Sequence, residues 1–405
     1  MKTLWIRAAI AASSLVACGG PTPTADTGAD AGALDAAPDG ESDASVSADS
    51  ALDAANDGST AADAAPLAPA ERATIVRKSD TCVSAPTDFG TYGAVTQYDR
   101  FEIANPAWVG GAPIAVQAFV PVGGAATHPV LFYAHPFGGN DWTRMRSMFE
   151  FWVSQDYVVV YAPYATSGAS VCERYDTLWG GFSRAVDLLS ARAGMDTTRV
   201  GFIGHSFGGG AVPWLATEAV RARGWGASGI FMMPNAPWYS YRMDAARWSA
   251  LPASARLHVM VFDEDDLNDH RIAIEDQWTP FPRAKQWINL RSAMNGSCSQ
   301  VADHLVPTTD STLMDSVRLN GLDYWGVWRH SHALASCVLR ADAAACAVID
   351  GSNAALQTTM GTWRSDNTAV TAAQRSDAPS APRPSSAYMF GVNRRALFPC
   401  EGRGM

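Results

Sequence analysis

The sequence predicts an α/β fold with a mostly parallel central sheet and helices on both of its faces. Short apolar runs rich in Val, Ile and Phe, typical of buried strands, alternate with longer amphipathic stretches of helical period. This alternation is typical of parallel strands joined by right-handed crossovers. Ahead of it, residues 98–104 and 113–122 predict an antiparallel N-terminal strand pair.

The alternation can be followed element by element along the chain. The strand runs are apolar throughout, as expected for parallel strands that are covered on both faces. No internal repeat is evident, and the length suits one domain with a C-terminal extension. We expect strands at 129–134, 157–161, 199–205, 229–233, 257–262 and 286–290, and helices at 142–155, 175–192 and 209–223.

The N-terminal part of the chain differs in composition from the rest. Residues 1–17 have a basic start and an apolar run too short to span a bilayer, which predicts a secretory signal peptide. Residues 18–70 hold ten acidic residues, no basic ones and almost no large apolar side chain, which predicts a disordered tether. Since the first segment carries +2 and the tether −10, residues 71–405 hold only −2 of the net charge of −10.

The end of the apolar run, Leu15-Val16-Ala17-Cys18, resembles the lipobox of bacterial lipoproteins. The resemblance implies cleavage before Cys18 and acylation of that residue, which anchors a chain in a membrane. Gly19 stands where many lipoproteins of the inner membrane have Asp. We therefore expect an outer-membrane or cell-surface lipoprotein, with a periplasmic or secreted protein as the alternatives.

Six cysteines remain after Cys18, an even number that suggests up to three disulfides in an exported chain. Their spacing does not fit a zinc site. Only Cys337 and Cys346 form a favoured local pair. The acidic total argues against a nucleic-acid partner, which would need a basic face. We expect a monomer.

The strongest chemical signal is the pentapeptide Gly204-His205-Ser206-Phe207-Gly208, between an expected strand and an expected helix. A serine on a sharp turn there projects its hydroxyl above the sheet, and small neighbours let strand and helix approach closely. The free N–H groups that open the helix favour a developing oxyanion. The pattern predicts Ser206 as a nucleophile.

Residues 196–209 resemble the stretch around the nucleophile in dienelactone-hydrolase-like and cutinase-like esterases of the α/β-hydrolase family, and the resemblance covers about residues 95–340. It implies the α/β-hydrolase fold and a second oxyanion donor in the loop after the strand at 129–134. That loop reads His135-Pro136-Phe137-Gly138-Gly139. The main-chain N–H groups of Phe137 and Phe207 are the expected donors, with Gly138 as a neighbouring possibility. His135 is expected to be structural.

The resemblance also implies the chain order Ser, acid, His, with the acid after the strand at 257–262. The chain there contains several carboxylates in succession, beginning Asp263-Glu264-Asp265-Asp266. Counting from the end of the strand favours Asp266, and Asp265 and Asp263 remain alternatives. Clustered carboxylates can also ligate calcium, which is a second reading of this run.

The general base is expected after the strand at 286–290. His304 is the first histidine there and falls in an expected loop. His330 and His332 fall in an expected late helix, where they read as ordinary polar residues of a helix face. Position therefore favours His304 as the base.

Together these features predict a secreted, lipid-anchored serine hydrolase that cleaves carboxylic esters through an acyl-enzyme on Ser206, with His304 as base and Asp266 as orienting acid. No metal or organic cofactor is expected, and the substrate is a small-molecule or polymeric ester. Among nearby aromatic residues Trp238 is the candidate for substrate binding. A peptidase or acyltransferase with the same triad, or a non-catalytic surface interaction module on a hydrolase fold, are the alternatives.

Overall fold

The computed structural model describes residues 67–310, 318–351 and 353–400. The expected signal peptide, Cys18 and nearly all of the expected tether lie outside these residues. The described strands of the main sheet are β1 (Glu71–Thr74), β2 (Gln97–Ile103), β3 (Val116–Pro121), β4 (His128–Ala134), β5 (Val158–Ala162), β6 (Met195–His205), β7 (Gly229–Asn235), β8 (Arg256–Phe262), β9 (Lys285–Leu290) and β12 (Gln374–Ser376). A separate hairpin consists of β10 (Ala293–Asn295) and β11 (Cys298–Gln300).

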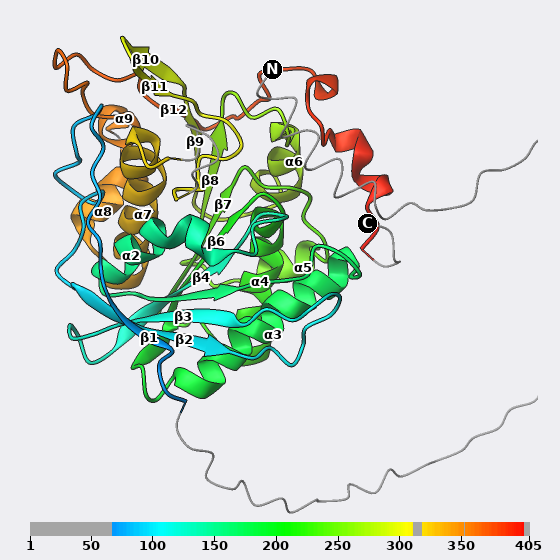
Figure 1. The fold of residues 1–405 in the computed structure, drawn as a ribbon. Coiled ribbons are helices and arrows are strands. Elements are labelled where there is room, and N and C mark those ends of the chain that lie inside the picture. Colours follow the sequence, from blue (N-terminus) through cyan, green and yellow to red (C-terminus); the bar gives the residue numbers. More distant parts are fainter. Residues whose placement is uncertain (1–66, 311–317, 352, 401–405) are drawn as a thin grey trace, which may run out of the picture. The chain divides into compact units, whose positions relative to one another are not determined.

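The main sheet is mixed and mostly parallel, in the order β1-β2-β3-β5-β4-β6-β7-β8-β9-β12 (Figure 1). The six strands from β5 to β9 in this order pair in parallel. The strands β1, β2 and β3 pair antiparallel, and so does β12 with β9. Tyr98 lies opposite Pro121 and Ile103 opposite Val116, which confirms the predicted N-terminal strand pair.

Helices cover both faces of this sheet. They are α2 (Arg146–Ser154), α3 (Val171–Leu189), α4 (Phe207–Arg223), α5 (Ala245–Ala250), α6 (His270–Ala273), α7 (Arg329–Arg340), α8 (Ala343–Ile349) and α9 (Ala354–Thr358). Short segments of 3-10 or π geometry are also present in the described structure: η1 (Trp142–Met145), η2 (Ile274–Trp278), η4 (Leu322–Trp328), η5 (Ser385–Ala387) and η6 (Val392–Leu397).

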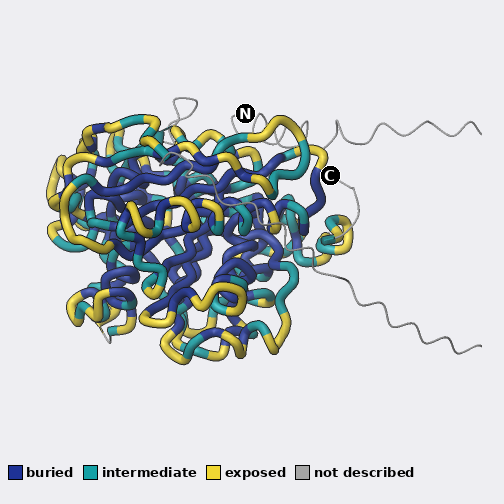
Figure 2. The backbone as a smooth tube through the Cα atoms, turned by 90° about the horizontal axis from the view of Figure 1, so that it is seen from below, coloured by how far each residue is buried: buried dark blue, intermediate teal, exposed yellow. Residues whose placement is uncertain are grey.

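Neighbouring residues of β4 show how the two faces are filled, because successive side chains of a strand point to opposite faces. Phe132 stacks on the ring of Trp225 and packs against Phe182 of α3. Tyr133 packs instead against Phe149 and Trp152 of α2. Figure 2 shows that the buried backbone gathers between these layers, whereas exposed residues lie in the surrounding loops. The α/β class predicted from the alternating runs is confirmed.

Helix α3 begins at Val171, earlier than the predicted start at residue 175. Ser170 caps it: the Glu173 N–H donates to Ser170 Oγ (3.2 Å), and the Ser170 N–H donates to Glu173 Oε2 (2.7 Å). Such a reciprocal pair satisfies two of the N–H groups that a helix start leaves open. The cap adds one turn that the apolar periodicity did not reveal.

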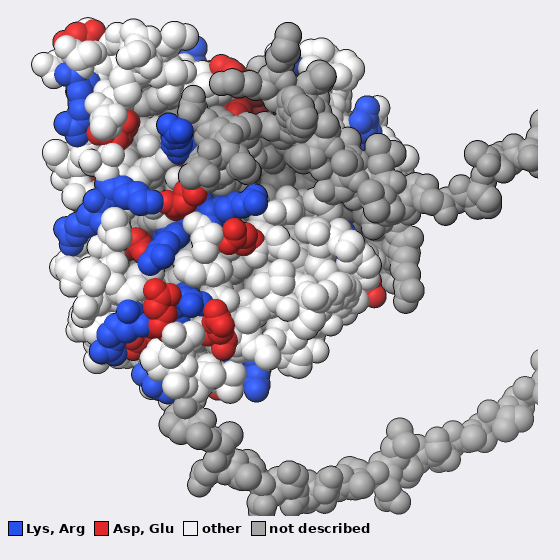
Figure 3. All heavy atoms as spheres, viewed as in Figure 1, with Lys and Arg blue, Asp and Glu red and all other residues white. Residues whose placement is uncertain are grey.

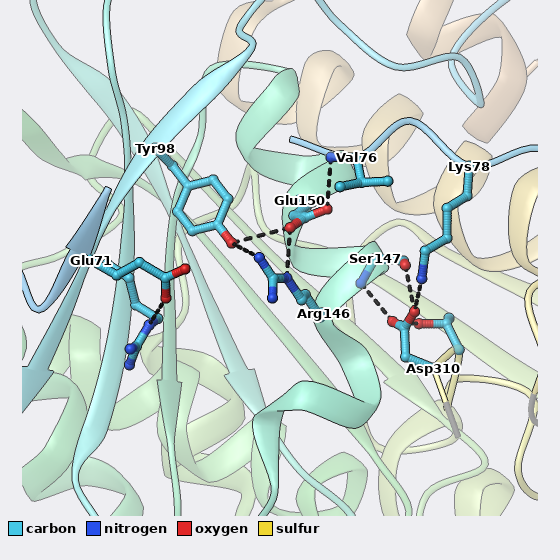
Figure 4. Close-up of polar contacts among 10 residues, drawn as sticks. Glu71, Val76, Lys78, Tyr98, Arg146, Ser147, Glu150 and Asp310 are labelled. Atoms are coloured by element: carbon cyan, nitrogen blue, oxygen red, sulfur yellow. Dashed lines mark hydrogen bonds and ion pairs between the residues drawn. The ribbon is translucent and has the colours of Figure 1, made fainter. Parts of the chain in front are cut away.

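A buried carboxylate ties the N-terminal strands to α2. Glu150 is 2% exposed and accepts hydrogen bonds from Tyr98 Oη (3.1 Å), Arg146 Nε (2.8 Å) and the Val76 N–H (3.1 Å), as Figure 4 shows. Asp310 accepts two more hydrogen bonds from the first turn of the same helix. The charge of Glu150 is therefore buried with its partners in place, as a stable fold requires.

Three disulfides join Cys82 to Cys298, Cys172 to Cys400, and Cys337 to Cys346. The predicted local pair is confirmed. Disulfides persist in oxidising compartments, so they favour an exported protein. Within the described ranges, no helix combines the length and the apolar character that crossing a membrane requires.

Acidic and basic side chains are interspersed on the face shown in Figure 3, where they gather over the β1 and β2 side of the molecule. There Arg72 pairs with Asp99 (2.7 Å) and Arg100 with Glu71 (3.0 Å), each pair joining β1 to β2. Charges of both signs close together leave no broad field of one sign on this face. The pattern agrees with the small net charge of residues 71–405.

Candidate active site

Ser206 is the single residue between the end of β6 and the start of α4. Its φ of 54° and ψ of −116° place a non-glycine residue in a conformation that costs about 1–3 kcal/mol and is concentrated at functional sites. The main chain holds it there. The Ser206 N–H donates to Asn235 O (2.9 Å), and the Ser206 carbonyl accepts from the N–H groups of Gly210 (2.9 Å) and Trp238 (2.8 Å).

Two glycines of the pentapeptide make this turn possible. A Cβ on Gly208 would lie 2.0 Å from the carbonyl oxygen of Ala134, at the end of β4. A Cβ on Gly204 would lie 2.5 Å from the carbonyl oxygen of Gly208. Any larger residue at either position would push the start of α4 away from the sheet. The glycines therefore let the start of α4 lie close to the ends of β4 and β6.

The carboxylate that meets His304 is that of Asp265, which the sequence analysis kept as an alternative to the favoured Asp266. His304 Nδ1 donates to Asp265 Oδ2 (2.8 Å), and both side chains are buried. The other oxygen, Oδ1, accepts from the N–H groups of Leu267 (2.8 Å) and Asn268 (3.1 Å). These two bonds make a tight turn directly after β8, and this turn directs Asp265 rather than Asp266 at His304. Asp266 still acts on His304 through its charge.

The two charges of this pair stabilise one another. Burial by itself would lower the pKa of His304, but the charge of Asp265 and the hydrogen bond to it outweigh burial and raise the pKa above 6.5. Burial by itself would raise the pKa of Asp265, and the charge of His304 with the hydrogen bonds lowers it below 3.8. Asp265 is therefore ionised near neutral pH, and it fixes the proton of neutral His304 on Nδ1.

The loop between β8 and α6 (residues 263–269) is called the acid loop. Asn268, which the sequence analysis did not single out, connects this loop to Ser206. Its side-chain amide donates to Ser206 Oγ (3.4 Å) and to Ala236 O (2.8 Å), while its own N–H bonds Asp265. The main chain of His304 is joined to the turn at Ser206, because the His304 carbonyl accepts a hydrogen bond from Nε2 of His205, the residue before Ser206 (2.7 Å). Within the described residues Ser206 Oγ and His304 share no hydrogen bond; such contacts commonly tighten only when substrate binds.

The N–H groups of Phe137 and Phe207 make no hydrogen bond within the described part of the chain. Phe207 opens α4, where unpaired N–H groups and the helix dipole favour a negative charge. Between the two rings lies the buried guanidinium of Arg174, 5.3 Å from the ring of Phe137 and 5.9 Å from that of Phe207. Its Nε donates to Ala165 O (2.8 Å), so this cation is held in place near the rings of Phe137 and Phe207.

The remaining candidate histidines belong to the core. His135 is fully buried, stacks on Tyr164 at 4.1 Å and accepts the Tyr164 N–H on Nε2, which agrees with a structural role. His330 packs against His258, with ring centroids 5.0 Å apart. His332 Nδ1 bonds Phe89 O (2.9 Å). On α7, His330 is fully buried and His332 is partly buried, so His330 does not lie on the polar helix face that was expected.

Trp238 is 4% exposed and lies beneath the turn, where its ring packs against Phe207 at 5.5 Å. Two further rings reach it from the C-terminal part of the chain, namely Phe390 at 6.1 Å and Phe398 at 5.3 Å. The sequence analysis treated these residues only as an extension. The signal available was the cluster of aromatic residues shortly before Cys400, but nothing in the sequence indicates where that segment lies.

Among the described residues, no group of three or more histidine, cysteine, aspartate or glutamate side chains is arranged to hold a metal ion. Of the carboxylates after β8, Asp263 accepts from the Ser292 N–H (3.1 Å), Asp265 meets His304, and Asp269 accepts from the Arg271 N–H (3.0 Å). A scan of family models finds none that matches this chain, and no curated protein matches it with significance. Inference about function therefore depends on the geometry of Ser206, His304 and Asp265.

Proposed function

We propose that the protein is a serine hydrolase that cleaves carboxylic esters and belongs to the α/β-hydrolase family. The observation that carries the proposal is the strained Ser206 between β6 and α4, with the buried His304–Asp265 pair joined to the same turn. The order of the three residues along the chain matches that family. So does the position of the nucleophile between a parallel strand and a helix.

In the proposed reaction Ser206 Oγ attacks the ester carbonyl while His304 Nε2 takes the hydroxyl proton. The carbonyl oxygen becomes negative, and the N–H groups of Phe137 and Phe207 stabilise it. When the tetrahedral intermediate collapses, the alcohol leaves with the proton from His304, and an acyl-enzyme remains. Water then loses a proton to His304 and attacks the acyl carbon, which releases the acid and returns the proton to Ser206.

Asp265 contributes by orientation and charge. It holds the proton on His304 Nδ1, so that Nε2 is the atom free to accept one, and it stabilises the imidazolium that forms. Because Asp265 is fully buried and receives two main-chain N–H bonds, its carboxylate is fixed before substrate binds. Such preorganisation is the main source of electrostatic catalysis.

The test is covalent labelling with a fluorophosphonate probe. The natural chain should be labelled and Ser206→Ala should not, while His304→Ala should lose turnover of p-nitrophenyl acetate. His330→Ala and His332→Ala should retain turnover if they fold, because neither residue contacts the site. Failure of the probe to label well-folded protein would count against a serine hydrolase and favour a non-catalytic role. Transfer of the acyl group to an added alcohol or amine faster than to water would instead identify an acyltransferase.

We also propose export of the chain and anchoring through an acylated Cys18. The three disulfides support an oxidising location, and the lipobox-like residues before Cys18 support the anchor. Cys18→Ser should then move the protein from the membrane fraction to the soluble fraction. Continued membrane association of this variant would contradict lipidation at Cys18.

A further inference from the structure

The C-terminal segment (residues 383–400) runs directly past the acid loop. The Phe390 N–H donates to Leu267 O (2.7 Å), and Phe390 O accepts from the Asp269 N–H (3.0 Å). Phe390 thus pairs with the chain around Asn268, the residue whose amide reaches Ser206 Oγ. Figure 1 shows this segment, coloured red, beside α6, which follows the acid loop.

The segment is held along its whole length. Near its start, Arg383 donates to the carbonyl of Asp265 itself. In its middle, Tyr239 Oη donates to Gly391 O (2.6 Å). Near its end, Tyr241 Oη donates to Phe398 O (2.7 Å), and the disulfide from Cys400 fixes the last residue to the start of α3. A segment bound at so many points presents its side chains in defined positions.

Its aromatic side chains extend the ring cluster around Ser206 to the surface. Trp238 and Phe207 are almost fully buried, at 4% and 2% exposure. Phe390 and Phe398 pack against Trp238 and against each other, at 5.7 Å, but both remain partly exposed. The C-terminal segment therefore supplies two rings of the accessible edge of the cluster, and Tyr241, also partly exposed, packs on Trp238 at 5.9 Å. An apolar surface beside a nucleophile binds the apolar part of a substrate by removing it from water.

We propose that the C-terminal segment forms a wall of the substrate site, that Phe390 is the side chain on it that contacts substrate, and that the preferred substrates are esters with a large apolar group. This inference rests on the proposed ester hydrolysis at Ser206. Phe390 is chosen because its main chain pairs with the acid loop on both sides of Asn268, and the Asn268 side chain reaches Ser206 Oγ. The main chain of Phe398 has no such bond to the acid loop among the described residues. The proposal makes the extension a determinant of specificity.

The experiment compares the kcat/KM of small and large esters for the natural chain and for Phe390→Ala. Removing the ring should lower kcat/KM about 10-fold or more for a large ester and by a much smaller factor for p-nitrophenyl acetate. A loss with p-nitrophenyl octanoate would place the apolar group on the acyl side, and a loss with 1-naphthyl acetate would place it on the alcohol side. The proposal would be overturned if the natural chain and Phe390→Ala had the same ratio of kcat/KM for the large ester to kcat/KM for p-nitrophenyl acetate, with both p-nitrophenyl octanoate and 1-naphthyl acetate as the large ester.

Leu397→Ala is the matched control, since Leu397 lies on the same segment, is 67% exposed and is absent from the ring cluster. It should behave as the natural chain with every ester. Phe390→Leu, which keeps an apolar side chain, should retain part of the preference and serves if Phe390→Ala fails to fold. Cys400→Ser, which frees the end of the segment, should weaken the preference for large esters without abolishing fluorophosphonate labelling. If the natural chain is not labelled by the probe and does not cleave p-nitrophenyl acetate, the proposed ester hydrolysis is wrong. If the natural chain is active but Phe390→Ala does not change its preference among esters, only the proposed role of the C-terminal segment is wrong.

Discussion

His304 Nδ1 lies 2.8 Å from Asp265 Oδ2, with the carboxylate fully buried and the imidazole nearly so. This contact decides between neighbouring carboxylates that are alike in the sequence. It also sets the charge states of both groups, which makes the proposed mechanism open to several independent measurements.

Asp265→Asn should lower kcat for ester hydrolysis by about 10³-fold or more, because an amide no longer stabilises the imidazolium or selects its tautomer. Asp266→Asn is the matched control and should stay within about twofold of the natural chain. Steady-state kinetics with p-nitrophenyl acetate measure both. A large loss in Asp266→Asn with little loss in Asp265→Asn would restore the original sequence-based choice.

The activity of the natural chain should fall on the acid side as His304 takes up a proton. Since the pKa of His304 is raised above 6.5, the acid limb of kcat/KM should lie above pH 6.5. In Asp265→Asn the main cause of the rise is gone, and only the weaker charges of Asp303 and Asp266 oppose burial, so the residual activity should extend to lower pH. A pH–rate profile of each protein checks this, and an acid limb that does not move between them would contradict the assignment.

Ser206→Gly should raise the stability of the fold while it abolishes labelling. Glycine adopts a φ of 54° without steric cost, and after the larger backbone entropy of an unfolded glycine is subtracted, a gain of about 1 kcal/mol remains. Ser206→Ala keeps a Cβ and should show no such gain, so the two variants isolate backbone strain. Urea denaturation monitored by tryptophan fluorescence gives the comparison; equal stabilities would mean that the turn is not strained.

The fold should lose stability in mild acid because buried histidines are held neutral. Burial lowers the pKa of His258 and His135 to about 3 and that of His332 to about 4, compared with 6.5 when exposed. Between those values the unfolded chain binds more protons than the folded chain, so the free energy of unfolding falls as pH falls, on the order of 1.4 kcal/mol per pH unit for each such histidine. Urea denaturation at pH 7 and pH 5 measures the loss.

His258→Gln removes one of these titrating groups and should lose less stability between pH 7 and pH 5 than the natural chain does. For each protein the free energy of unfolding at pH 5 is subtracted from its own value at pH 7, so a difference in stability between the two proteins at pH 7 does not affect the result. An identical pH dependence in both would indicate that His258 is already protonated, or open to water, in the folded state.

Glu150→Gln should lower the free energy of unfolding by about 2 kcal/mol, since it replaces a buried carboxylate that accepts three hydrogen bonds. Glu102→Gln is the control, because Glu102 pairs with Arg100 at the surface with half of its side chain exposed. That change should cost no more than about 0.5 kcal/mol. If both substitutions lowered the free energy of unfolding by the same amount, the buried hydrogen bonds of Glu150 would contribute no more to stability than the exposed ion pair of Glu102.

The central strands were predictable because each is an apolar run bounded by turn residues. The turn at Ser206 was predictable because a strand run, a glycine-rich pentapeptide and a helical stretch follow one another in the sequence. Counting along the chain favoured Asp266, whereas the carboxylate in contact with His304 is that of Asp265, and the reason is physical. Asp265 and Asp266 differ only in direction, which depends on Asp265 Oδ1 taking the N–H groups of Leu267 and Asn268, and counting along a chain does not reveal that turn.

The C-terminal extension shows a second limit of sequence patterns. Strand β12 has three residues and η6 six, so neither is long enough to display a period of apolar side chains. The position of Phe390 depends on main-chain bonds to a loop more than a hundred residues earlier, and that of Cys400 on its bond to Cys172. Contacts so distant in sequence leave no local trace in composition.

The two long-range disulfides interleave along the chain, joining Cys82 to Cys298 and Cys172 to Cys400 across 216 and 228 residues. A chain whose thiols oxidised in order of synthesis would join Cys82 to Cys172 first, and that bond is not native. Native pairing therefore needs thiols kept reduced until residue 400 has emerged, or later thiol–disulfide exchange. Recombinant yield should depend on a disulfide isomerase or a glutathione redox buffer, and a chain truncated before Cys400 would carry an unpaired thiol at Cys172 that is prone to crosslinking between molecules.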